Sequence, residues 1–314
     1  MRHSPPSWTT EDMPSLKGRL AVVTGATSGI GYVTARELAR AGAEVVVTGR
    51  DAGRARRATE DMAREVPGAR VRPDLLDLAD LASVTGFAHR VEHGGRPVDL
   101  LVNNAGVMGI RHRATTREGF ELTVGTNHLG HFALTGRLLP HLLAAPAPRV
   151  VTVSAAISRS AIAELSDLQS TRKYRPLNAY AKSKLANVLF ALELQRRADA
   201  AGVPLTSAAV HPGFSATGLQ RHASRPVRAL ARLLPGHFVG QSVASAALPT
   251  LYAATAEDVA PGGFYGPTGR FETRGAPGPV DLPTPAADAG LAARLWRTSE
   301  SLTHVRYRWP EAVP

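Results

Sequence analysis

Short apolar runs alternate with longer segments of helical periodicity over most of the chain. In the segment after the first run, YVTARELARAGA, apolar residues recur at every third or fourth position, and Gly42 follows as a helix-ending residue. Most of the runs are continuously apolar rather than alternating with polar residues, which indicates strands that are buried on both faces. The predicted strands lie at 19–24, 44–48, 69–72, 99–102, 149–153 and 204–210.

Strands of this kind, separated by helices, predict a single α/β domain. The expected architecture is a Rossmann-type, doubly wound parallel sheet of about seven strands with helices on both faces. The helical pattern DLLDLADLASVTGFAHRV begins directly after the third strand, and the glycine- and proline-rich residues 262–288 predict irregular structure. We expect a flexible N-terminal segment at 1–16, the domain at 17–305 and a C-terminal tail at 306–314.

The composition of the 314 residues is that of a globular protein, with 44% hydrophobic and 20% charged residues. The absence of cysteine excludes disulfides, thiolate metal sites and cysteine nucleophiles, and no metal site is expected. The formal net charge is +11, yet the arginines are scattered and aromatic residues make up only 5%, so nucleic-acid binding is not expected. A phosphorylated dinucleotide would suffice as the anionic partner.

The sequence contains no recognisable targeting or membrane segment. The polar N-terminus lacks the apolar core of a secretory signal. The most apolar stretch of the first half, residues 138–157, is interrupted by Pro140, Pro146, Pro148 and Arg149, which argues against a membrane-spanning helix. We therefore expect no transmembrane segment and a cytoplasmic location.

The motif TGATSGIG, residues 24–31, follows the first predicted strand and opens the first helix. In a dinucleotide-binding loop, Gly25 would permit the tight turn, Gly29 would let the backbone approach a pyrophosphate, and Gly31 would let the helix pack on the strand. The helix N-terminus would supply N–H groups to the phosphates. A glycine-rich turn without a ligand is the alternative. The expected coenzyme contacts in this loop are Gly25, Thr27, Ser28, Gly29, Ile30 and Gly31.

The end of the second strand distinguishes NAD from NADP, because an acidic residue there would bind the ribose 2′-hydroxyl. This chain has Gly49 at that point, followed by Arg50. Without a carboxylate the repulsion against a 2′-phosphate is removed, and the Arg50 guanidinium can pair with that phosphate. Asp51 is expected to cap the next helix instead. The sequence therefore predicts NADP(H) in preference to NAD(H).

Three of the four lysines, Lys173, Lys182 and Lys184, lie close to Tyr180 in the sequence. Tyr180 and Lys184 are four residues apart in a helical pattern, so they share one face of the helix. A tyrosine with an ordinary pKa of about 10 is a poor acid or base at neutral pH, and a nearby ammonium is expected to lower that pKa. Lys182 lies on another face. The alternative is an ordinary helix tyrosine beside solvated lysines.

Two further features favour a catalytic role for this pair. Ser154 ends the fifth strand at the carboxyl edge, where doubly wound sheets bind ligands, and its hydroxyl can donate to a carbonyl oxygen. The run NNAG, residues 103–106, follows the fourth strand, and its small residues permit close packing on a coenzyme. A plain turn at the end of the strand is the alternative for this run.

In combination these motifs are highly specific, and over about residues 17–305 the sequence resembles the short-chain dehydrogenase/reductase family. The resemblance rests on TGATSGIG, NNAG, Ser154 and YAKSK (180–184), in that order. Within the family the sequence is most similar to the branch of the retinol dehydrogenases, WW-domain oxidoreductase and protochlorophyllide reductase. The segments that indicate this branch are DLQSTRKY, AYAKSKLANVLF, HPGFSAT, GGFYGP and RLWRTSE.

The resemblance implies a role for each motif residue. Tyr180 would be the proton donor or acceptor, Lys184 would hold the nicotinamide ribose and tune Tyr180, and Ser154 would orient the carbonyl. Asn127, in the helical segment GTNHLGHFALT, would hold a water of the proton relay. The other implied coenzyme contacts are Asp77 and Leu78 at the adenine, with Asp74 as a rival, Asn104, Ala105 and Gly106 on the adenosine side, and Pro212, Gly213 and Thr217 at the nicotinamide.

The predicted function is hydride transfer between NADP(H) and a carbonyl or alcohol group of a fairly apolar small molecule. Ala155 and Ala156 follow Ser154 where the branch often has another serine, which leaves one polar group fewer near the substrate. Residues 214–242 predict a substrate lid, and contact of their basic stretch RPVRALARLL with a membrane or partner is the alternative. A catalytically silent NADP(H)-binding regulator and a natural-product tailoring enzyme are the alternative functions. Both a monomer and a homodimer are consistent with the sequence.

Overall fold

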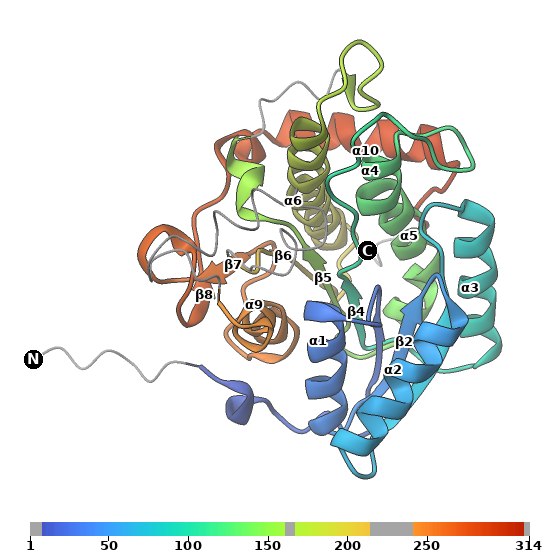
Figure 1. The fold of residues 1–314 in the computed structure, drawn as a ribbon, viewed down its shortest axis with the longest axis vertical. Helices are drawn as coiled ribbons and strands as arrows, with labels where there is room; N and C mark the ends of the chain where they lie inside the picture. The colour runs from blue at the N-terminus through green and yellow to red at the C-terminus, as the bar shows by residue number, and fades with distance from the viewer. Residues whose placement is uncertain (1–7, 161–166, 214–240, 311–314) are drawn as a thin grey trace, which may run out of the picture.

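The computed structural model describes residues 8–160, 167–213 and 241–310. These residues form one α/β domain around an eight-stranded sheet of order β3-β2-β1-β4-β5-β6-β7-β8 (Figure 1). All neighbouring strands pair in parallel except β7 and β8, which are antiparallel. The strands are β1 (Leu20–Val23), β2 (Glu44–Gly49), β3 (Arg70–Leu75), β4 (Leu100–Asn103), β5 (Arg149–Val153), β6 (Thr206–Val210), β7 (Phe264–Pro267) and β8 (Pro277–Pro279). The predicted Rossmann-type architecture is confirmed.

The last two strands lie within residues 262–288, where irregular structure was expected, so that prediction is wrong there. Tyr265 of β7 pairs with Val210 of β6, and Gly266 pairs with Gly278 of β8. Glycine and proline are unfavourable in strands, so a prediction from residue propensities misses β8. This strand lies at the edge of the sheet. Proline is tolerated at an edge because the N–H groups on its outer side have no strand to pair with.

Helices cover both faces of the sheet, and alternate strand residues pack against them. Leu20 and Val22 of β1 belong to one apolar cluster with residues of α3, α5 and α6, whereas Ala21 and Val23 belong to another with residues of α1, α2 and α9. One face therefore carries α1 (Gly29–Arg40), α2 (Ala52–Glu65) and α9 (Val243–Thr255), and the other carries α3 (Leu81–His93), α5 (Gly130–Leu143) and α6 (Pro176–Ala200). A further helix, α10 (Ala289–Thr303), packs on α6 and α5.

Shorter helical segments connect these elements. They are η1 (Thr10–Asp12), α4 (Leu122–Val124), the π-helical turn η2 (Gly125–Leu129), η3 (Ala156–Ser160), η5 (Arg270–Glu272) and η6 (Thr284–Ala287).

Two predicted helix ends are confirmed. Gly42 follows α1 with φ +99°, a left-handed conformation that glycine adopts without strain. The carboxylate of Asp51 accepts a hydrogen bond of 2.8 Å from the Arg54 backbone N–H and caps α2. Asp51 therefore serves as the N-terminal cap of α2.

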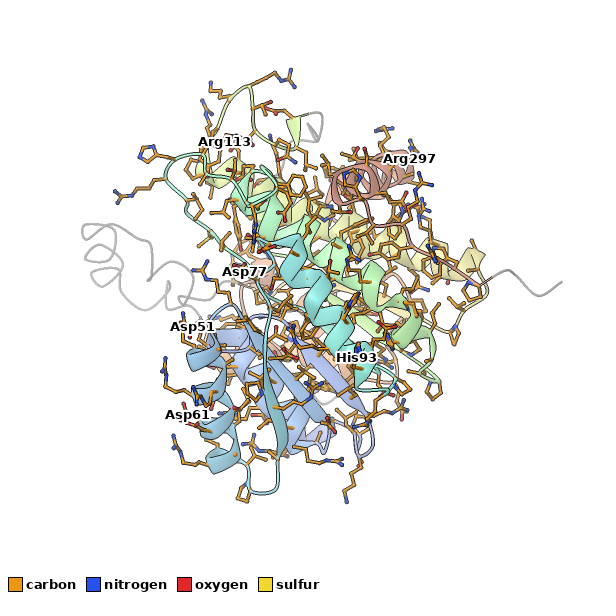
Figure 2. All side chains as sticks on the ribbon, turned by 90° about the vertical axis from the view of Figure 1, so that its right-hand side faces the viewer. Asp51, Asp61, Asp77, His93, Arg113 and Arg297 are labelled. Carbon is orange, nitrogen blue, oxygen red and sulfur yellow. The ribbon has the colours of Figure 1, made fainter. Side chains whose placement is uncertain are left out.

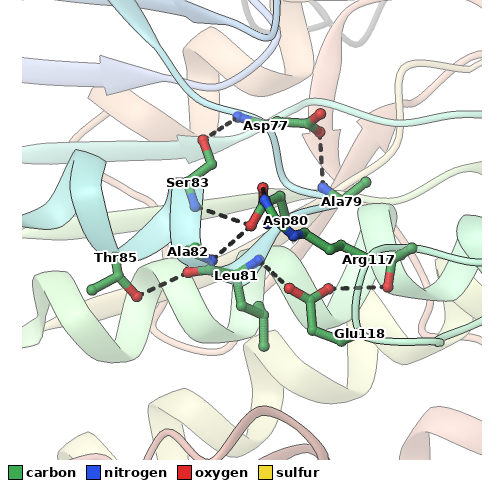
Figure 3. A network of polar contacts seen from close by, with 10 residues as sticks. Asp77, Ala79, Asp80, Leu81, Ala82, Ser83, Thr85, Arg117 and Glu118 are labelled. Carbon is green, nitrogen blue, oxygen red and sulfur yellow. Dashed lines mark hydrogen bonds and ion pairs between the residues drawn. The ribbon is translucent and has the colours of Figure 1, made fainter.

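The boundary between β3 and α3 differs from the prediction. Asp74 and Leu75 continue β3 by pairing with Thr48 and Gly49 of β2, so the first residues of the helical pattern are a strand. The helix itself begins at Leu81, where the Asp80 carboxylate accepts from the backbone N–H groups of the first turn (Figure 3). The apolar spacing of the segment fits both a strand and a helix. Only the pairing with β2 decides between them.

Parts of the expected terminal segments pack on the domain. The Trp8 ring lies 5.4 Å from the Tyr252 ring in an edge-on arrangement, and Leu16 is buried. At the other end, the buried Tyr307 donates a hydrogen bond of 2.8 Å to the carbonyl of Phe132. Within residues 8–160, 167–213 and 241–310, no helix is both long and apolar enough to cross a bilayer. The predicted lid at 214–242 lies outside the described residues except for its last two positions.

Candidate active site

The predicted site residues follow the carboxyl ends of the strands. Figure 2 shows Asp51 and Asp77, which follow β2 and β3, on one side of the molecule, and His93 at the end of α3 toward the other side. Because β1 to β7 are parallel, the loops after their carboxyl ends all open on the same edge of the sheet. This edge is where a dinucleotide would bind.

The glycine loop lies between β1 and α1, and its backbone favours glycine. Gly25 and Gly29 have φ +64° and +61°, which side chains disfavour. A Cβ atom added to Gly31 would lie 2.6 Å from the Gly25 carbonyl oxygen, so only glycine lets α1 begin this close to β1. A Cβ atom added to Gly29 would meet no atom within 4 Å. The loop is therefore closely packed at Gly31 and open at Gly29. It has room for a phosphate group at the N-terminus of α1.

One hydroxyl, that of Thr24, joins this loop to the turn after β4. It accepts hydrogen bonds from the backbone N–H groups of Asn104 and Ala105 at 2.8 and 2.9 Å. The Asn104 side chain donates to the Thr24 carbonyl at 2.7 Å. A Cβ atom on Gly25 would lie 2.9 Å from the Ala105 Cα, so the loop and the turn are in close contact. The NNAG run is thus a structural neighbour of the phosphate loop.

His131, which no sequence motif singled out, extends this network to Asn127. Its Nδ1 lies 2.9 Å from the Asn127 carbonyl oxygen and its Nε2 lies 2.9 Å from the Thr24 hydroxyl. Burial lowers the pKa of His131 to about 4, so the ring is neutral at physiological pH. The carbonyl can only accept, which assigns the proton to Nδ1 and makes Nε2 the acceptor for Thr24. The four-residue spacing from Asn127 was the available signal in the sequence.

The corner expected to hold the 2′-phosphate is exposed. Arg50 is exposed and forms no ion pair with any residue of the described ranges. A Cβ atom on Gly49 would lie 2.6 Å from Thr27 Cγ2, so this residue must be small where β2 meets the phosphate loop. The Arg50 side chain is thus accessible to solvent directly after β2.

Asp74 and Asp77, the two candidates for the adenine contact, lie at different places in the structure. Asp74 lies within β3 and is paired with Arg90 at 2.9 Å and with Arg72 at 3.4 Å. Asp77 lies after the strand, where its carboxylate accepts the Ala79 backbone N–H at 3.0 Å and its own N–H donates to Ser83 (Figure 3). Asp77, with the buried Leu78, is therefore better placed at the carboxyl edge than Asp74.

Lys184 of α6 is buried, with 3% of its surface exposed. Its ammonium donates to the Val153 carbonyl at 2.9 Å and lies 5.8 Å from the centre of the Tyr180 ring. Burial lowers the pKa of Lys184 to about 8. Burial also raises the pKa of Tyr180 to about 12, contrary to the expected lowering. The desolvation of the phenolate outweighs the attraction of an ammonium that is directed at a backbone carbonyl.

Ser154 lies at the end of β5 as predicted, but its hydroxyl faces the protein interior. Its Oγ donates to the Lys184 carbonyl at 2.7 Å, and only 2% of the residue is exposed. In this rotamer the hydroxyl fixes α6 against β5. Ala155, the next residue, is half-buried.

Asn127 lies in the π-helical turn η2 and its side chain is fully engaged. Its Oδ1 accepts from the Val107 N–H at 2.7 Å, and its Nδ2 donates to the Val107 carbonyl and to the Ser183 hydroxyl, both at 3.0 Å. A Cβ atom on Gly106 would lie 3.2 Å from Asn127 Oδ1 and 3.5 Å from Lys184 Nζ. Gly106, Asn127 and Lys184 therefore meet at one point.

The turn after β6 contains the predicted nicotinamide contacts Pro212 and Gly213, while Thr217 lies outside the described residues. The Gly213 N–H donates to Nδ1 of the buried His211 at 3.2 Å, and His211 Nε2 lies 3.0 Å from Glu272. Burial lowers the pKa of His211. His211 and Glu272 were not predicted from the sequence as supports of this turn, although His211 belongs to the HPG motif.

Comparison with known proteins adds independent findings. A family model described as short chain dehydrogenase matches residues 19–227. Polyprenol dehydrogenase from Mus musculus is 45% identical over 295 residues, which cover 93% of this chain and 85% of that protein. Retinol dehydrogenase 13 from Homo sapiens is 38% identical over 295 residues, covering 92% and 85%.

Solved structures show the same fold. The crystal structure of an uncharacterised protein from Mycobacterium paratuberculosis is 44% identical and superposes with a TM-score of 0.79, covering 96% of this chain and 99% of that one. A short chain dehydrogenase from Shigella flexneri, crystallised with NADP, has a TM-score of 0.62 at 22% identity, covering 80% and 98%. At that identity the second structure supports the fold alone.

Proposed function

The chain belongs to the short-chain dehydrogenase family, and on that premise we propose that it is an NADP(H)-dependent oxidoreductase with Tyr180 as its acid and base. The reaction interconverts an alcohol and the corresponding carbonyl compound. The observation that carries the proposal is the meeting of Gly106, Asn127 and Lys184 beside Tyr180, at the same sheet edge as the open glycine loop. A nicotinamide bound at this edge supplies or accepts the hydride.

The residues of this chain would hold the coenzyme at three points. The N-terminus of α1, with Gly25, Gly29 and Gly31, holds the pyrophosphate. Arg50 pairs with the 2′-phosphate, and this pairing is the basis for the proposed preference for NADP(H). Asp77 and Leu78 lie at the adenine. The remaining proposed contacts are Thr27, Ser28, Ile30, Asn104, Ala105, Gly106, Tyr180, Lys184, Pro212, Gly213 and Thr217.

The protonation of Tyr180 suits carbonyl reduction. With a pKa of about 12 the phenol keeps its proton at neutral pH and can donate it to the carbonyl oxygen as that oxygen gains negative charge. In the oxidative direction Tyr180 must first lose the proton. The Lys184 ammonium stabilises the resulting phenolate when it turns from the Val153 carbonyl toward the ring.

Ser154 and Asn127 complete the proposed catalytic set. Ser154 orients the substrate oxygen when its hydroxyl leaves the Lys184 carbonyl. Asn127 holds the Val107 backbone with both ends of its amide and keeps the turn after β4 against Lys184. Its backbone carbonyl, already bonded to His131, is the group that would hold the relay water.

We propose a long apolar alcohol, or the corresponding aldehyde, as the substrate. Two relatives that align over more than nine-tenths of this chain are named for polyprenol and for retinol, both of them apolar alcohols. Their names support the substrate class and do not identify one compound. A cytoplasmic location, and a monomer or a homodimer, also remain predictions.

Coenzyme-dependent turnover tests the proposed function. The purified chain is incubated with NADPH or NADH and with retinal, a polyprenal or a short aldehyde, and coenzyme oxidation is followed by absorbance. We expect turnover of the long apolar aldehydes with NADPH in preference to NADH. Binding of NADPH without turnover of any aldehyde or alcohol would instead favour the silent regulator. Turnover confined to a polar, polycyclic carbonyl compound would favour the tailoring enzyme.

A further inference from the structure

A second concave site lies away from the coenzyme edge. A groove of about 800 Å³ lies between α5, α10 and the C-terminal residues that follow α10. Figure 2 shows Arg297, which lines this groove from α10, on the opposite side of the molecule from Asp51 and Asp77. The groove therefore belongs to none of the contacts proposed for the coenzyme or the substrate.

The C-terminal segment lies directly across α5 because Gly136 has no side chain. A Cβ atom added to Gly136 would come within 2.7 Å of both Val305 Cγ1 and Tyr307 Cε2. Val305 and Tyr307 are buried, whereas the alternate residues Arg306 and Arg308 are exposed. This two-residue alternation anchors the segment by its apolar side chains and leaves both guanidinium groups at the groove.

The charges that line the groove are strongly unbalanced. Its arginines are Arg137, Arg297, Arg306 and Arg308. Of the described residues that line it, only Glu300 is acidic. None of the four arginines forms an ion pair within the described part of the chain, whereas Arg90, Arg96 and many others do.

Arg137 extends the basic lining of the groove to α5. Its Nε is buried and has no hydrogen-bond partner among the described residues. Arg137 as a whole is only half-buried, and it lines the groove. Arg137 comes from α5 and Arg306 from the C-terminal segment, so the donors converge from two elements.

We propose that this groove binds a ligand that carries two or more phosphate groups. Guanidinium groups match phosphate oxygens with paired, charge-assisted hydrogen bonds, and several arginines around one cavity suit more than one phosphate. The volume lies in the range of small-molecule sites. A free polyphosphate and the headgroup of a phosphorylated lipid share this chemistry. Basic residues after α10 also offset its helix dipole, but that effect involves neither Arg137 nor a ligand.

The test measures the binding of inorganic pyrophosphate to the full chain by calorimetry. NADPH is added in a parallel titration, so that binding at the glycine loop and binding in the groove are separated. The double variant Arg306→Ala/Arg308→Ala changes only exposed side chains, and Arg56→Ala/Arg57→Ala on α2 removes the same charge elsewhere. Thermal unfolding confirms that both variants are folded.

We expect the groove variant to bind pyrophosphate at least about tenfold more weakly than the wild type, while the α2 variant binds normally. Sedimentation with phosphatidylcholine vesicles, with and without a phosphatidylinositol bisphosphate, forms the second arm. Groove-dependent binding to the bisphosphate-containing vesicles identifies a lipid headgroup, and groove-dependent binding of pyrophosphate without binding to these vesicles identifies a free ligand. Equal losses in the two double variants, or no binding to either probe, overturn the proposal. The comparison between the two double variants does not depend on the binding of NADPH. The groove proposal and the proposed function can therefore be rejected separately.

Discussion

The catalytic end of the proposed coenzyme site and its ribose-phosphate end are built in opposite ways. Lys184, Ser154 and Asn127 are buried, and each is held by a backbone group at 2.7–3.0 Å. Arg50 is exposed and has no ion-pair partner among the described residues. Proton transfer depends on prior alignment of the reacting groups, whereas recognition of a phosphate needs an available charge. Substitutions at the catalytic end should therefore change rate, and those at the other end should change affinity.

The largest effect is expected at the phenol. Tyr180→Phe removes the proposed proton donor, and kcat should fall about 10³-fold while NADPH binding is retained. Steady-state kinetics and a fluorescence titration of NADPH measure the two quantities. Tyr174→Phe is the matched control, because the Tyr174 hydroxyl donates to the Ile110 carbonyl at 2.8 Å rather than serving the reaction. Near-normal turnover by Tyr180→Phe would falsify the assignment of Tyr180.

The next effect concerns the coenzyme. Arg50→Ala removes the charge proposed to face the 2′-phosphate, and the KM for NADPH should rise about 10- to 100-fold with little change in kcat. The KM for NADH should stay nearly constant, since NADH lacks that phosphate. Equal increases for the two coenzymes would show that Arg50 does not distinguish them.

A smaller effect is expected from the titration of Lys184. Because burial lowers the pKa of Lys184 to about 8, the side chain is an ammonium below that pH and is neutral above it. Stabilisation of the phenolate and contact with the ribose both use the charged form. We expect kcat/KM to fall about tenfold per pH unit above this pKa. Lys184→Arg keeps its charge and should lose this dependence, although its activity will be lower. A dependence unchanged in Lys184→Arg would assign it to another group.

The smallest effect separates Asp51 from its neighbour Arg50. Asp51→Ala removes the cap of α2 and should cost about 1 kcal/mol of the free energy of unfolding, measured by denaturant titration. Asp51→Asn keeps an acceptor oxygen and should recover most of the loss. The KM for NADPH should not change in either variant, and a large increase would place Asp51 in the coenzyme site instead.

The prediction from sequence was strongest where short-range patterns decide the structure. The apolar runs predicted β1, β2, β5 and β6 closely because strands buried on both faces consist mostly of apolar residues. It failed at β7 and β8, whose identity depends on the neighbouring strand β6. Asp74 gives a second example, since its pairing with Thr48 of β2 extends β3 into a pattern that also fits a helix.

The candidate site also has features that the sequence predicted and features that it could not predict. The residue types and their order, from the glycine loop to Tyr180 and Lys184, were readable as motifs that resemble one family. The direction of each polar group was not readable, because it depends on partners distant in the sequence. Ser154 is turned to the Lys184 carbonyl, and His131 joins Thr24 to Asn127 across more than a hundred residues.

By itself, the sequence determined the fold class and the family, and it supplied the residues proposed for the chemistry, because these follow from local pattern and residue type. Only the tertiary structure decided the electrostatics of the site and the position of the arginine groove. Burial sets the pKa of Tyr180 and Lys184 through the removal of water, and burial is a property of the packed chain. The groove likewise exists only because Gly136 lets residues 305–308 lie against a helix that is distant in the sequence.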